Sequence, residues 1–190
     1  MYFYNDTQNT NEEIEKNISE ENVANSILAS SGVNSDDVPI DIEEVMRSYD
    51  FAICVATSFV NEKIGAGIAY SDKKLKKIDT GRYFVFKKDI PNRDRRYFMS
   101  LAISYFVMES GGKYYQKILY NSDLVDEDSL YSRIARVARA ILMPQKSLST
   151  LIMSPMLSSL TQVEKIERVS KAFLVSNDIA KIRMKETGLI

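Results

Sequence analysis

The sequence predicts one domain that combines helices with a few short strands around a single buried helix. Residues 91–109 are apolar on nearly every side, and a helix of this kind must be buried all round. Three short segments between residues 51 and 86 are rich in strand-forming residues, and helical periods flank them on both sides. With 190 residues, of which 45% are hydrophobic, the chain can bury a core of this size.

The first fifty residues predict a polar tail followed by two helices. Residues 1–20 are rich in Asn, Thr, Glu and Ser, which favours a mobile tail, so we expect the domain itself to span residues 21–190. A helical period begins at Glu21 and ends at Gly32. A second helix follows Pro39, with Asp41 as its N-cap and Glu44 three residues later.

Three strands are predicted at residues 51–55, 64–70 and 83–86. Residues 71–81 suit an exposed hairpin loop between the last two. Gly65 and Gly67 could belong to a phosphate loop, but a third glycine and a following helix are missing. A strand approached closely by another backbone explains them better. The loop carries Lys73, Lys74, Lys76 and Lys77.

Three further helices are predicted after the central one, which Gly111-Gly112 should end. Residues 123–128 form an acidic segment that could bind a hard cation. Its spacing does not match a calcium loop, so we expect it to precede a helix over 130–143, capped by Asp128 or Ser129. Residues 163–190 predict a terminal helix pair, with Ser176 or Asn177 capping the second helix and Gly188 closing it.

Composition excludes several kinds of function. The chain has no histidine and one cysteine, Cys54, so neither a catalytic triad of the usual kind nor an internal disulfide is available. No signal peptide or membrane span is evident, and we expect a cytoplasmic protein. The net charge of −1 conceals a split: residues 1–50 carry 12 acidic and 2 basic side chains. We expect an acidic segment folding over a basic body, a basic surface for an acidic partner, or two solvated faces.

The central helix resembles the active-site helix of the ImmA/IrrE-type metallopeptidases. That helix reads roughly Arg-x-Arg-Phe-Thr-Leu-Ala-His-Glu-Leu-Gly-His, and here Arg96 and Leu101-Ala102 correspond to it. The family's two zinc-binding histidines fall on Ile103 and Val107, and its catalytic glutamate falls on Ser104. Hydrocarbon cannot bind zinc, so the resemblance implies a degenerate member without catalytic activity, metal or cofactor.

Weaker matches cover residues 22–190 in the same order. Val137-Ala138 and Ile141 to Pro144 resemble the segment that supplies the family's third zinc ligand, which falls on Arg133 here. The chain's end matches the family's terminal helices, except that Leu174 replaces the turn glycine. The resemblance implies an α+β, zincin-like helical domain with a small antiparallel three-stranded sheet and a C-terminal helix-turn-helix-like pair.

Two functions follow as expectations. The first is a regulator or inhibitor encoded by a phage or mobile element, which binds a helix-turn-helix repressor or a host defence protein. The second is a DNA-binding transcriptional regulator that uses the terminal helix pair and a basic surface. The candidate protein-binding residues are Arg133, Arg136 and Arg139, which could equally form a solvated helix face, with Lys73, Lys74, Lys76 and Lys77; the candidate DNA-binding residues are Lys181, Arg183 and Lys185.

Overall fold

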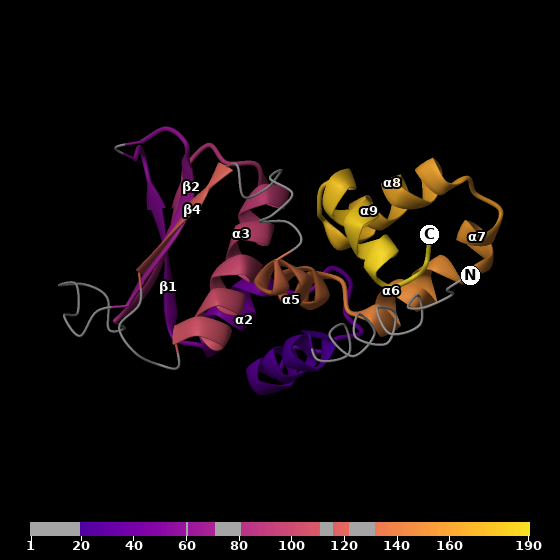
Figure 1. Cartoon of the computed structure of the whole chain (residues 1–190), viewed down its shortest axis with the longest axis horizontal. Coiled ribbons are helices and arrows are strands. Elements are labelled where there is room, and N and C mark those ends of the chain that lie inside the picture. The colour runs from indigo at the N-terminus through magenta and orange to yellow at the C-terminus, as the bar shows by residue number, and fades with distance from the viewer. Residues whose placement is uncertain (1–19, 60, 71–80, 111–115, 122–131) are drawn as a thin grey trace, which may run out of the picture.

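The computed structural model describes residues 20–59, 61–70, 81–110, 116–121 and 132–190. A β-sheet forms one end of the molecule and the C-terminal helices form the other, with the central helix α3 lying against the sheet (Figure 1). The protein is therefore a mixed α+β structure, as the sequence predicts. None of the helices in the described ranges has both the length and the apolar character needed to span a bilayer.

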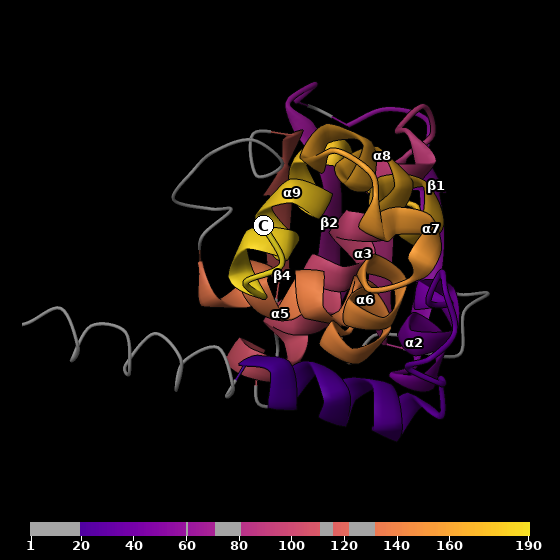
Figure 2. The same cartoon turned by 90° about the vertical axis from the view of Figure 1, so that its right-hand side faces the viewer.

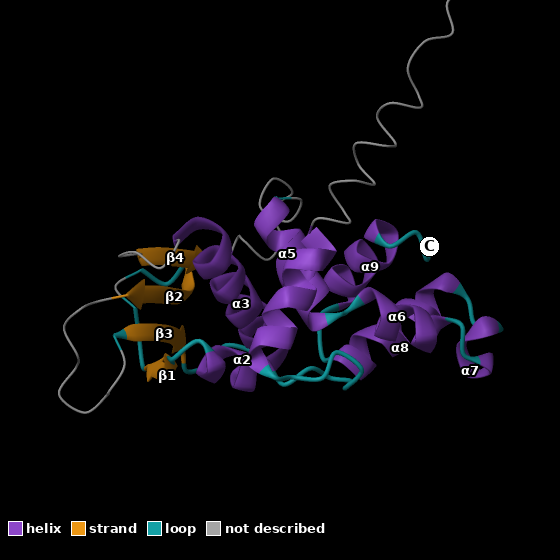
Figure 3. Cartoon of the chain, turned by 90° about the horizontal axis from the view of Figure 1, so that it is seen from below, coloured by secondary structure: helices purple, strands orange, loops and turns teal. Residues whose placement is uncertain are grey.

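The sheet has four strands in the order β1-β3-β2-β4, as Figure 3 shows from below. The three predicted strands are confirmed, but the prediction of a three-stranded antiparallel sheet is wrong. β1 pairs in parallel with β3, and an unpredicted strand pairs antiparallel with β2. Local sequence patterns indicate where strands lie but not which neighbour each one selects. The strands are β1 (Phe51–Ala56), β2 (Ile64–Tyr70), β3 (Arg82–Lys87) and β4 (Gln116–Tyr120).

The central helix is confirmed as a buried element, although its last turn differs from the prediction. Helix α3 covers Asn92–Tyr105, and a π-helical turn, η1, continues over Phe106–Ser110. Every residue from Arg96 to Ser104 is buried. Val107, in the π-helical turn, is 37% exposed, so the expectation of burial on all sides is wrong there. The predicted end at Gly111-Gly112 lies outside the described residues.

Gly65 allows α3 to approach the sheet closely. A Cβ atom added to this β2 residue would lie 2.6 Å from the nearest ring carbon of Phe98 on α3. On the same strand, the Cβ of a residue at Gly67 would lie 3.4 Å from the backbone oxygen of Lys117 on β4. The predicted close approach at Gly65 is therefore found, but it is made by side chains, the Phe98 ring and the Asn121 amide oxygen, each at 2.6 Å, rather than by another backbone.

The C-terminal helices pack on the side of α3 away from the sheet, and Figure 2 shows them in front of it. Asp41 is confirmed as an N-cap, because its carboxylate accepts a 3.0 Å hydrogen bond from the Glu44 N–H. Ser132 caps α5, so the prediction of Asp128 or Ser129 is wrong. The helices are residues 20–31, α2 (Ile42–Ser48), α5 (Arg133–Leu142), α6 (Gln145–Ile152), α7 (Pro155–Ser158), α8 (Gln162–Phe173) and α9 (Asn177–Glu186).

The terminal helix pair, α8 and α9, is confirmed. Ser176 caps α9 by accepting a 3.2 Å hydrogen bond from the Ile179 N–H, and Gly188 follows α9 with φ at +68°. Leu174 makes the turn between the helices in the left-handed conformation, with φ at 53°. Glycine adopts this conformation without strain, whereas leucine adopts it at a cost in free energy. The tight turn nevertheless forms with Leu174 in place of the glycine.

Candidate functional site

The positions equivalent to the family's zinc site lie at the end of α3 and in η1. The Ile103 side chain is fully buried, and its hydrocarbon belongs to the core. The Ser104 hydroxyl donates a 2.8 Å hydrogen bond to the Ser100 carbonyl oxygen, so its proton is engaged by the backbone. Val107 exposes 37% of its surface. These three positions therefore offer packing and a helix-internal hydrogen bond rather than metal ligands.

The third position of the resemblance, Arg133, is the first residue of α5. Its side chain is 58% exposed, and its Nε lies 3.6 Å from a carboxylate oxygen of Glu20. Within the described ranges, no three or more His, Cys, Asp or Glu residues are grouped so that they could hold a metal ion. Cys54 is half-buried on β1.

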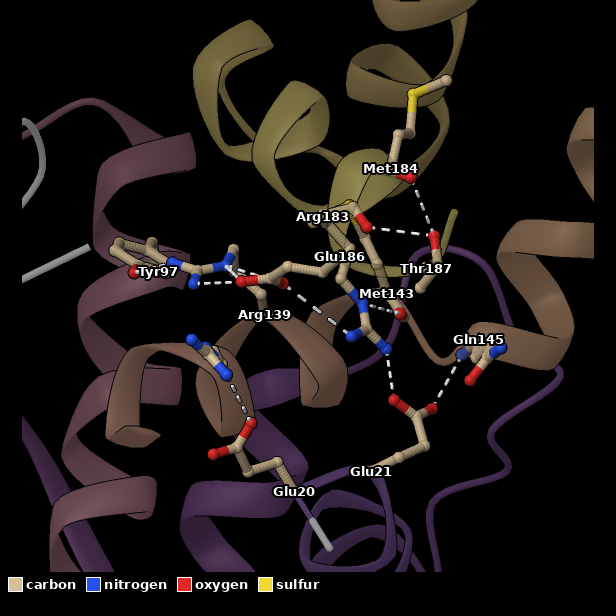
Figure 4. Close-up of polar contacts among 11 residues, drawn as sticks. Glu20, Glu21, Tyr97, Arg139, Met143, Gln145, Arg183, Met184, Glu186 and Thr187 are labelled. Atoms are coloured by element: carbon tan, nitrogen blue, oxygen red, sulfur yellow. Dashed lines mark hydrogen bonds and ion pairs between the residues drawn. The ribbon is translucent and has the colours of Figure 1, made fainter. Parts of the chain in front are cut away.

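A buried ionic cluster joins α3, α5 and α9 (Figure 4). The Arg139 guanidinium is fully buried, and its Nε donates 3.1 Å hydrogen bonds to both carboxylate oxygens of Glu186. A terminal nitrogen of Arg139 donates to the Tyr97 hydroxyl at 3.3 Å. Burial raises the pKa of Tyr97 to about 12. The prediction that Arg139 shares an exposed ridge with the other two α5 arginines is therefore wrong.

Arg183 belongs to the adjoining part of this cluster and is also buried. Its Nε donates a 3.1 Å hydrogen bond to the Met143 carbonyl oxygen, and a terminal nitrogen pairs with Glu21. The other Glu21 oxygen accepts a 2.8 Å hydrogen bond from the Gln145 N–H. The Glu21 carboxylate thereby caps α6, whose own N-cap, Pro144, provides no side-chain acceptor. Arg183 is thus committed inside the protein and cannot contact a DNA phosphate as predicted.

The acidic N-terminal part contacts the basic remainder through several ion pairs. The buried Glu20 carboxylate lies 3.6 Å from both Arg133 and Arg136. Burial raises the pKa of Glu20, and the two arginines offset this only in part. The expectation of an acidic segment folding over a basic body therefore holds for these described residues. Two further pairs of this kind join Glu43 to Arg95 at 3.3 Å and Asp36 to Lys146 at 2.9 Å.

The structure describes only some of the lysines that were predicted to bind a partner or DNA. Lys181 and Lys185 are exposed on α9. The hairpin lysines Lys73, Lys74, Lys76 and Lys77 lie outside the described residues, as does the acidic segment 123–128. Of the predicted cations that the structure describes, Arg139 and Arg183 are buried and the others are wholly or partly exposed.

Three strongly exposed apolar side chains lie among the C-terminal helices, which form the end of the molecule opposite the sheet (Figure 1). Met153, Met156 and Val163 expose 73%, 72% and 68% of their surface, respectively. We call these three residues the apolar tip. Sequence reasoning missed it, although residues 147–163 contain no charged side chain, which is unusual for a solvated stretch.

A cleft of about 660 Å³ separates the helix at residues 20–31 from the start of α6. Asn25, Val33 and Lys146 contribute to its mixed polar and apolar lining. Glu21 also lines it, but this carboxylate already pairs with Arg183 and the Gln145 N–H. The cleft therefore offers little uncommitted charge for a ligand.

No model of a known protein family matches the chain, and no curated protein matches it. The resemblance to the ImmA/IrrE-type metallopeptidases rests on the quoted sequence motifs. Function must therefore be argued from the side chains at the candidate site and on the surface.

Proposed function

We propose that this chain is a catalytically inactive, ImmA/IrrE-like protein that acts by binding another protein. The observation that carries the proposal is the use of the zinc-site positions for packing. Ile103 is fully buried in the core, and the Ser104 hydroxyl bonds a backbone carbonyl in the same helix. A scaffold that has lost its metal ligands but keeps a packed core can still present a binding surface.

The apolar tip is the surface that we assign to the partner. Burying exposed apolar side chains is the main driving force of protein association, and methionine adapts to differently shaped partners. Much of the charge that favoured an electrostatic surface is instead used within the fold, between Glu20 and the α5 arginines and between Glu21 and Arg183. Following the resemblance, we propose a helix-turn-helix repressor or a host defence protein as the partner.

A pull-down from the native host, or from its phage-infected lysate, tests this proposal. The tagged protein is used after nuclease treatment, and bound proteins are identified by mass spectrometry. We expect one stoichiometric protein partner, which a Met153→Gln, Met156→Gln, Val163→Thr variant fails to recover. The control is Ile118→Thr, which changes a 39% exposed residue on the sheet and should bind normally.

Two results would contradict the proposal. Retention of the partner by the triple variant would exclude the apolar tip as the binding surface. Elemental analysis that finds one zinc ion per chain would overturn the assignment of an inactive site, because the positions described above provide no ligands for it.

DNA binding is the second candidate function, favoured by the exposure of Lys181 and Lys185 on α9. Each phosphate contact releases counterions, so affinity should fall steeply as salt is raised. Fluorescence anisotropy with duplex DNA over a salt series measures this dependence. If α9 contacts DNA, a Lys181→Gln, Lys185→Gln variant should bind more weakly and with a shallower salt slope; equal binding by this variant and the wild type would exclude α9.

A further inference from the structure

The two edges of the sheet differ in how they are protected. β4, at one edge, carries Lys117 and is irregularly paired with β2 between Ile64 and Ala66. Charged residues and register irregularities are common devices that prevent a sheet edge from pairing with another chain. β1, at the opposite edge, reads Phe-Ala-Ile-Cys-Val-Ala and contains no charge, proline or glycine. Among the described residues, the β1 edge therefore lacks the protection that β4 has.

In every second residue of β1, the backbone N–H and C=O groups point toward this edge. The Ala56 carbonyl oxygen accepts a 2.9 Å hydrogen bond from the Lys88 N–H, at the end of the parallel pairing with β3. Because backbone groups alternate along a strand, Phe51, Ile53 and Val55 point their N–H and C=O groups away from β3. Within the described ranges, no strand pairs with that side of β1 (Figure 3).

The Val55 side chain is exposed at the end of β1. Val55 lies opposite Phe86 in the parallel register, and Phe86 lies under the Arg95 guanidinium of α3 at 5.2 Å. Val55 therefore points to the helix-covered face of the sheet. It is nevertheless 58% exposed, so the helical layer does not reach this end of β1.

We propose that β1 pairs antiparallel with β1 of a second copy of this chain, so that two sheets join into one. The two-fold axis passes between the Ile53 residues of the two copies. Phe51 then lies opposite Val55 of the second copy, and Phe51, Ile53 and Val55 all form hydrogen-bonded pairs. This register gives about six hydrogen bonds between the copies.

The pattern of β1 favours a second copy over an unrelated strand. Opposed residues in an antiparallel pair share a face of the sheet, and this register pairs odd-numbered residues with odd-numbered ones. β1 itself carries no charged residue, so this register places no like charges opposite one another. The exposed Val55 side chain would be partly buried by Phe51 of the second copy. Six residues of edge are short for a standard interface, so we expect a weak, concentration-dependent dimer.

Sedimentation velocity of the full chain, from about 5 µM to about 500 µM, tests the dimer. We expect the wild type to dimerise with rising concentration, and Val55→Lys to weaken the dimer about tenfold or more by placing a charge on the edge. Ile118→Lys is the matched control, since Ile118 is also an exposed apolar residue but lies on β4, at the opposite edge of the sheet. A wild type that stays monomeric throughout overturns the proposal, and so does a dimer that Val55→Lys leaves unchanged.

Cys54 tests the register because it is the chain's only cysteine. In the proposed pairing, Cys54 lies opposite Ala52 of the second copy, and the two Cys54 residues are diagonal neighbours about 8 Å apart. A bismaleimide cross-linker of this span should give a covalent dimer in the wild type and much less in Val55→Lys. A dimer that yields no cross-linked species overturns the register.

Discussion

Replacing Arg139 by methionine should strongly destabilise the protein. The substitution removes a fully buried guanidinium and keeps most of its length in hydrocarbon. The Glu186 carboxylate, of which 11% is exposed, then keeps only its distant pair with Arg183 at 3.9 Å. The Tyr97 hydroxyl also loses its donor. The variant therefore leaves a nearly buried negative charge without its principal partner.

The magnitude follows from this imbalance. Removing one partner of a buried ion pair costs about 3–5 kcal/mol, because the remaining charge has lost its solvent and its partner. The residual contact between Glu186 and Arg183 places the expected loss near the lower limit, at about 3 kcal/mol. Also replacing Glu186 by methionine removes the orphaned charge, and the double variant should recover about 2 kcal/mol of that loss.

Urea denaturation at pH 7 measures these free energies of unfolding. Far-UV circular dichroism is the suitable signal, because the chain is largely helical and contains no tryptophan. Lys146→Met is the matched control: Lys146 pairs with Asp36 at 2.9 Å, but the two side chains are 76% and 53% exposed. This variant should lose at most about 1 kcal/mol. A loss in Arg139→Met no larger than in the control would refute the argument that burial makes the difference.

Three further substitutions test individual features of the fold by the same assay. Burial raises the pKa of Glu20 above 4.5, so its contribution to stability is present below pH 4.5 and is lost as pH rises through the folded-state pKa. Glu20→Gln should therefore be as stable as the wild type at pH 7, or more stable by up to about 1 kcal/mol; a clear loss at pH 7 would show that its ion pairs dominate. Leu174→Gly should stabilise by up to about 1 kcal/mol by relieving the left-handed backbone, whereas Gly188→Ala, at φ +68°, should destabilise; opposite signs would exclude backbone strain as the cause. Gly65→Ala should cost about 1–3 kcal/mol because its Cβ would lie 2.6 Å from the Phe98 ring, and a neutral result would mean that the ring moves aside easily.

Local patterns in the sequence were sufficient for most elements of the fold. The Asp41 cap, the buried α3 and the turn before α9 each depend on residues within a few positions of one another. The parallel pairing of β1 with β3 depends on residues about thirty positions apart, and β4 joins the sheet from beyond α3. The sequence pattern carries no information about which of these long-range pairings forms.

The buried cluster was missed for a related reason. Arg139 and Arg183 resemble surface residues in the sequence, because arginine in an amphipathic helix is usually exposed. Their burial depends on Glu186 and Glu21, which lie 47 and 162 positions away from them, respectively. The acidic character of residues 1–50 was the available signal, but it did not identify which carboxylates meet which arginines.

The distribution of charge links the fold to the proposed interactions. Glu21 pairs with Arg183 and caps α6, and Glu20 lies beside the α5 arginines, so part of the chain's charge asymmetry is neutralised inside one molecule. The β1 strand and residues 147–163 carry no charge and lie toward opposite ends of the molecule. A contact at one end leaves the other accessible. A dimer joined through β1 would therefore present two apolar tips, and would bind a dimeric partner more tightly than one copy could if the partner's two sites match their spacing.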